Sequence, residues 1–97
     1  MSFAGGSYEE GARWLWNFLT SHAKRETSRI EAVVDAEGER EGTSYAAWLH
    51  LGDRQSPVIE LSYREVSENR GSLAWCAALA ERVRALAREL TATARAS

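Results

Sequence analysis

The chain has 97 residues, with 12 Lys and Arg against 14 Asp and Glu, which gives a formal net charge of −2. This length fits one domain and excludes a second one of ordinary size. One cysteine, Cys76, excludes an intrachain disulfide and a cysteine-rich zinc site. The near-neutral charge argues against generic binding to phosphate backbones. With no apolar run near the ~20 residues of a membrane span and no signal segment, we expect a cytoplasmic protein.

Arginine dominates the basic residues, because Lys24 is the only lysine. Together with many alanines and four tryptophans, this composition indicates a GC-rich genome and a bacterial-type cytosol. The functional alternative is selection for bidentate, stacking arginine contacts.

The first element is predicted to be a helix from about residue 8 to residue 25. Residues 1–6 are expected to be loose, and Ser7 with Glu10 forms a capping-box pattern at the helix start. Gly11 costs the helix about 1 kcal/mol relative to alanine, and this cost indicates a close contact there. At 100° per residue, one face collects the apolar and weakly polar side chains of Tyr8, Ala12, Leu15, Leu19, His22 and Ala23.

Between residues 28 and 66 the apolar period changes from 3.6 to 2, which predicts three strands. The strands cover about residues 28–35, 43–51 and 58–66, and charged or glycine-containing turns separate them. The inward-facing residues are Ile30, Ala32, Val34, Tyr45, Ala47, Leu49, Leu51, Ile59, Leu61 and Tyr63.

A second helix is predicted from Leu73 onward, with residues 92–97 fraying. Its apolar stripe comprises Cys76, Leu79, Ala80, Val83, Leu86, Ala87 and Leu90. The order helix, three-stranded antiparallel meander, helix (αβββα) predicts a single α+β domain over residues 1–97. We expect a two-layer sandwich with both helices on one face of the sheet.

Pairing the inward residues predicts the register of the sheet. Val34 is expected opposite Tyr45, Ile30 opposite Leu49, and Leu49 opposite Leu61. The rows on the outer face are then Val33, Ala46 and Arg64; Glu31, Trp48 and Ser62; and Arg29, His50 and Glu60.

The outer face of the sheet is the predicted interaction surface. Trp48 lies on the central strand of an otherwise polar face, and a tryptophan with a charged rim is typical of a binding hot spot. The alternative is that Trp48 only covers the stems of neighbouring side chains. The candidate contact residues for another protein, including a second copy of the chain, are Trp48, His50, Arg29, Glu60 and Arg64, with Trp14 of the first helix as a second anchor.

The sequence offers little for catalysis. His22 and His50 are the only histidines, and Cys76 lies within a buried stripe, where a thiol is usually inert. Nucleophile, phosphate-loop and metal-ligand motifs are missing. We therefore expect a non-enzymatic protein without a cofactor, a small enzyme or ligand-binding protein being one alternative.

The order of the elements resembles that of the double-stranded RNA-binding domain, which reads A-form shape across the minor groove. Where that family has a lysine cluster before its second helix, this chain has residues 67–72, and its first turn, residues 37–41, is acidic. The resemblance implies the main alternative, a nucleic-acid-binding domain in which Arg70, Arg84 and Arg88 contact the duplex.

Overall fold

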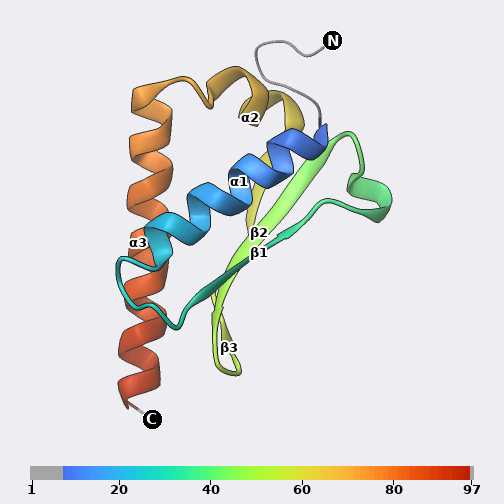
Figure 1. The fold of residues 1–97 in the computed structure, drawn as a ribbon. Helices are drawn as coiled ribbons and strands as arrows, with labels where there is room; N and C mark the ends of the chain where they lie inside the picture. Colours follow the sequence, from blue (N-terminus) through green and yellow to red (C-terminus); the bar gives the residue numbers. More distant parts are fainter. Residues whose placement is uncertain (1–7, 97) are drawn as a thin grey trace.

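The computed structural model describes residues 8–96, with side chains through residue 92, and has the predicted α+β architecture. Residues 1–7 and 97, including the expected capping box at Ser7, lie outside the described part. The elements in chain order are α1 (Tyr8–Ala23), β1 (Glu31–Asp35), the 3-10 turn η1 (Gly38–Arg40), β2 (Ser44–Leu51), β3 (Arg54–Gln55), β4 (Ile59–Ser62), α2 (Tyr63–Asn69) and α3 (Leu73–Ala96). Figure 1 shows α1 running beside β1 in the opposite direction, with α3 at the C-terminal end of α1.

The helices and the sheet enclose one core. It contains the inward residues of the strands, which confirms their predicted facing, and most of the predicted apolar residues of α1 and α3, although Cys76 is only partly buried. Its largest fully buried side chains are Tyr45, Leu15, Leu19, Ile30, Leu49, Ile59, Val66 and Val83. No helix in the described range is long and apolar enough to cross a membrane.

Gly11 lies where α1 crosses the central strand. It is buried, and a Cβ atom at this position would overlap the hydroxyl of Tyr45. The close contact that the sequence predicted at Gly11 is therefore confirmed. The Tyr45 hydroxyl donates to the main-chain carbonyl of Tyr8 at 2.8 Å, which fixes the helix against the sheet.

The sheet is antiparallel, with β2 between β1 on one side and β3 and β4 on the other. The predicted register of β1 was wrong by two residues, because Ala32 lies opposite Leu49 and Val34 opposite Ala47. An even shift leaves every side chain on its face, so the alternating pattern could not detect the error. The connection that sets the register contains η1, which the sequence pattern did not predict.

The predicted third strand was wrong in its second half. β4 ends at Ser62, and Leu61 pairs with Tyr45 instead of Leu49. The chain then enters α2, where the Ser62 hydroxyl accepts from the main-chain N–H of Glu65 at 2.9 Å. Ser62 and Glu65 have the spacing of a capping box, so a helix start was present in the sequence. Arg64 consequently lies on α2 and not on the sheet.

A one-residue bulge separates β3 from β4. His50 pairs with Gln55 and Ala47 with Ile59, so three residues, 56–58, lie opposite two residues of β2. Ser56 donates its N–H to the Leu49 carbonyl at 2.8 Å, and its hydroxyl accepts from the Leu49 N–H at 3.0 Å. Pro57, which has no N–H, is tolerated at this break in the ladder.

Candidate functional site

The face of the sheet opposite the helices, here called the open face, has an apolar row across its middle. Trp48 is half-buried, and Val33 lies directly opposite it on β1. Because Ile59 faces the core, its neighbour Val58 faces away from the helices, and Val58 is 46% exposed. Among the described residues no helix covers this row, so its apolar surface is accessible to a partner.

An ion pair covers the open face on one side of the apolar row. Arg40 of η1 contacts Glu60 through two nitrogen–oxygen pairs, at 2.7 and 3.0 Å, and lies 3.9 Å from Asp35. The hydrogen bond from Arg40 lowers the pKa of Glu60 and raises that of Arg40. Ala46, the register partner of Glu60 and Asp35, is only 3% exposed. Arg40 was not among the predicted contact residues, because it lies in the predicted turn between the first two strands and was expected to face solvent.

Only some of the predicted contact residues lie together on one surface. Trp48, His50 and Glu60 share the open face, but the neighbours of His50 are Glu31 and Gln55. Arg29 lies in the exposed turn before β1. Arg64 pairs with Glu68 on α2, at 3.0 Å. The predicted row of Arg29, His50 and Glu60 does not form, because the true register places other residues beside His50.

Trp14, the second predicted anchor, lies in an aromatic cluster between α1 and α3. Its ring centroid is 5.1 Å from that of Phe18 and 6.2 Å from that of Trp75, at an interplanar angle of 28°. The Trp75 indole N–H donates to Glu65 of α2 at 3.2 Å. Trp14 is half-buried here and joins the two helices, so less of it is available to a partner than the helical pattern indicated.

Side chains of α1 and of Lys24, which follows it, cap three carbonyls along the outer edge of β1. The Trp16 indole N–H donates to the Ala32 carbonyl at 3.0 Å. The Lys24 ammonium donates to the Ile30 carbonyl at 2.9 Å, and the Tyr8 hydroxyl lies 3.1 Å from the Ala36 carbonyl. Unpaired carbonyls at a sheet edge can hydrogen-bond to a strand of another molecule, and the caps prevent this. The β1 edge is thus a poor docking site.

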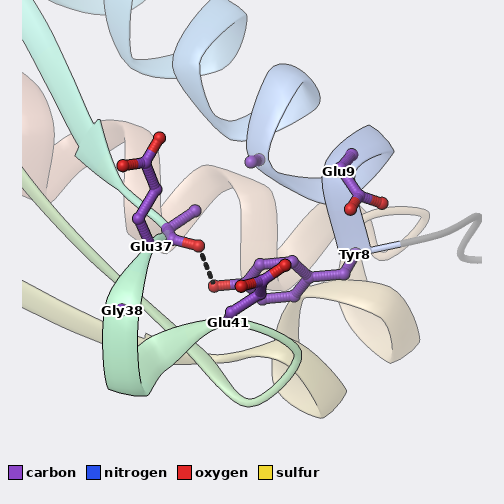
Figure 2. Close-up of a pocket in the computed structure, with 7 residues that line it drawn as sticks. Tyr8, Glu9, Glu37, Gly38 and Glu41 are labelled. Atoms are coloured by element: carbon purple, nitrogen blue, oxygen red, sulfur yellow. Dashed lines mark hydrogen bonds between the residues drawn. The ribbon is translucent and has the colours of Figure 1, made fainter.

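An acidic pocket of about 560 Å³ lies where α1 meets the β1–β2 connection (Figure 2). Its lining includes Tyr8, Glu9, Glu37 and Glu41. Burial and the neighbouring carboxylates of Glu41 and Asp35 raise the pKa of Tyr8, so its hydroxyl is protonated at neutral pH. This excess of carboxylates disfavours phosphate at this end of the molecule.

Three tyrosines join α1, β2 and α2 behind this pocket. The Tyr8 ring stacks on Tyr45, with centroids 4.7 Å apart and planes at 8°, and meets Tyr63 edge-on at 5.7 Å. The Tyr8 hydroxyl faces the carbonyls of Ala36, Arg40 and Ser44. The tyrosine that lines the pocket is therefore engaged in holding the β1–β2 connection.

His22 and Cys76, which were considered for catalysis, contact different residues of the fold and not each other. His22 contacts the ring of Phe18, with centroids 4.5 Å apart, and burial together with Arg25 and Arg84 lowers its pKa. The Cys76 thiol lies 3.5 Å from the Arg70 carbonyl. The described residues contain no group of His, Cys, Asp and Glu that could hold a metal ion.

The arginines expected to contact nucleic acid do not form one patch. Arg70 ends α2, whereas Arg84 lies roughly 16 Å along α3 from its start. Arg84 pairs with Glu81 at 3.7 Å and Arg88 with Glu26 at 3.2 Å. Their charge is therefore partly neutralised within the fold.

Comparison with known proteins gives no family for this geometry, since no family model, curated protein or solved structure matches the chain.

Proposed function

We propose that the protein is a non-enzymatic interaction module that binds another protein through the open face of its sheet. The observation that carries this proposal is Trp48, a half-buried tryptophan at the centre of a face that no helix of the described residues covers. Val33 of β1 lies opposite it, and Val58, in the bulge before β4, extends the apolar surface on the other side. Tryptophan is enriched among the residues that contribute most to binding, and such residues cluster near the centre of an interface.

The polar surroundings of the apolar row also suit a protein interface. Arg40 pairs with Glu60 and lies near Asp35 beside Ala46, so this side of the row carries a charged rim in which most of the charge is compensated. On the other side, Glu31, His50 and Gln55 form a polar rim that can hydrogen-bond to a partner.

A second copy of the chain is the first partner to test. Sheets pack face to face at about 10 Å, and a two-fold axis brings the same patch of each copy together. Trp48 of one copy would then meet the apolar row of the other. Three strands of four to eight residues give a face of roughly 15 by 20 Å, smaller than a stable dimer interface. We therefore expect weak, concentration-dependent association.

Sedimentation velocity over a range of concentrations tests this proposal. We expect the sedimentation coefficient of the parent chain to rise with concentration and that of Trp48→Thr to stay at the monomer value. Threonine is polar but keeps the preference for a strand. Leu73→Ser is the matched control, since Leu73 is 88% exposed on α3, away from the open face, and its loss should leave association unchanged.

Association of Trp48→Thr equal to that of the parent would show that the open face is not the contact surface. A parent chain that stays monomeric would exclude the second copy. Photo-cross-linking in the native host, with the reactive group at Val33 or, as control, at Ala77, then tests for another protein. Equal cross-linking from both positions would contradict the proposal.

A further inference from the structure

Among the described residues, the outward main-chain groups of Glu60 on β4 have no side-chain cap, whereas three outward carbonyls along the β1 edge are capped. The Tyr63 N–H donates to the Thr43 carbonyl at 2.8 Å, so alternate residues, Leu61 and Ile59, bond to β2. The N–H and C=O of Glu60 therefore point away from β2. Within the described residues no hydrogen bond engages them.

The Glu60 side chain leaves this edge unobstructed. Arg40 holds its carboxylate over the open face through two contacts, at 2.7 and 3.0 Å. The bulge at Pro57 interrupts the edge on one side, and the start of α2 at Tyr63 ends it on the other. The available edge is short, so main-chain pairing alone would bind weakly.

A hollow of about 150 Å³ lies beside this edge, between β4 and the helices α2 and α3. Its lining residues are Leu61, Glu65, Trp75, Ala78, Leu79 and Arg82. A cavity of this size holds a group as large as benzene. A strand added to β4 would direct alternate side chains to the same side as Leu61, next to the hollow.

The two charged residues that line the hollow are Glu65 and Arg82, and of these Arg82 can attract an acidic side chain. Glu65 already accepts the Trp75 indole N–H at 3.2 Å. Arg82 is exposed and forms no ion pair within the described chain. An incoming carboxylate would find an available guanidinium, which prefers such a partner.

We propose that the β4 edge and this hollow form a second docking site, which binds an extended peptide segment of another protein by strand addition. The peptide pairs with the main chain of Glu60, inserts one apolar side chain beside Leu61 and places an acidic residue near Arg82. The unpaired main-chain groups argue for an extended strand, because only such a segment offers donors and acceptors in this alternation.

Phage display of random ten-residue peptides against the full chain tests the proposal. We expect enriched peptides to contain an apolar and an acidic residue on the same side of an extended strand. Fluorescence anisotropy of one labelled peptide then compares Glu60→Pro with Glu60→Ala. Both variants lack the carboxylate, but only proline removes the outward N–H. We expect affinity at least tenfold lower for Glu60→Pro than for Glu60→Ala.

Ala78→Trp provides an independent test in case Glu60→Pro does not fold. It fills the hollow and should lower peptide affinity at least tenfold, whereas Ala77→Trp, on an exposed neighbouring position of α3, should change it less than twofold. Arg82→Glu should weaken binding of the acidic peptide in the same assay.

Several outcomes would overturn the proposal. One is a library that yields no specific peptide, and another is equal affinity for Ala78→Trp and Ala77→Trp. Peptides that lose affinity for Trp48→Thr but not for Ala78→Trp would assign binding to the open face instead. Self-association that Glu60→Pro abolishes and Trp48→Thr retains would identify the occupant as a second copy of the chain.

Discussion

At the scale of single residues, the packing of α1 on the sheet depends on the missing side chain of Gly11. The Tyr45 hydroxyl occupies the place of a Cβ atom there and donates to the Tyr8 carbonyl at 2.8 Å. Glycine is unfavourable within a helix by about 1 kcal/mol relative to alanine. The close approach of helix and strand offsets that cost.

We expect Gly11→Ala to destabilise the protein although it improves helix propensity. Overpacking a tight contact costs about 1–3 kcal/mol, which exceeds the gain in propensity. Urea denaturation gives the change in the free energy of unfolding. In the Tyr45→Phe background the obstructing hydroxyl is gone, so the same substitution should cost less than in the parent. A stabilising effect of Gly11→Ala in the parent would contradict this explanation.

His22 should make stability depend on pH between neutral and mildly acidic conditions. Burial and the charges of Arg25 and Arg84 lower its pKa in the folded state below the ordinary value of 6.5. The unfolded chain then binds the proton first as the pH falls below 6.5, so stability decreases through this range.

Urea denaturation at pH 7.5 and 5.5 measures this dependence. His22→Leu should lose less stability between the two pH values than the parent. An unchanged pH dependence in His22→Leu would assign the effect to other groups.

At the scale of elements, α1 covers the core and also protects the edge of β1. Trp16 and Lys24 donate to the Ala32 and Ile30 carbonyls, at 3.0 and 2.9 Å. The two edges of the sheet therefore differ. The main chain of Glu60, on the β4 edge, has no such cap within the described part of the chain.

The double variant Trp16→Phe, Lys24→Met should expose the β1 edge. Both substitutions keep apolar contact but remove the donors, and each unsatisfied carbonyl costs up to about 1–3 kcal/mol where water cannot replace the donor. We expect lower stability in urea and increased aggregation, measured by light scattering during incubation at 37 °C. Arg25→Met, beside Lys24, is the control. A double variant as stable and monodisperse as this control would show that the caps have no role.

At the scale of the whole molecule, the sequence predicted the order of the elements and the facing of the strands, because alternation and helical periodicity report burial directly. It did not predict the register, because pairing Ala32 with Leu49 instead of Ala47 leaves every side chain on the same face of the sheet. It also missed α2, because Ile59, Leu61 and Tyr63 continue an alternating pattern into a helix that Ser62 caps.

The candidate site was predicted less well than the fold. Trp48 was identified because it interrupts a polar face of the central strand. Val58 was missed because the predicted pairing of Leu49 with Leu61 placed it away from Trp48, whereas the observed pairing of Ala47 with Ile59 brings it close. Arg40 was missed because its contact with Glu60 joins residues twenty positions apart, which no local pattern reveals.

The central strand β2 carries both the core and the open face on alternate residues, with Leu49 fully buried next to half-exposed Trp48. A ligand on the open face therefore contacts the same strand whose other face contributes residues to the hydrophobic core. Binding at that surface would raise the free energy of unfolding. Any ligand that binds only the native state adds RT ln(1 + [L]/Kd), which is about 2.7 kcal/mol when the ligand concentration is a hundred times Kd. The melting temperature of the purified chain can accordingly serve as a general sensor for its binding partners.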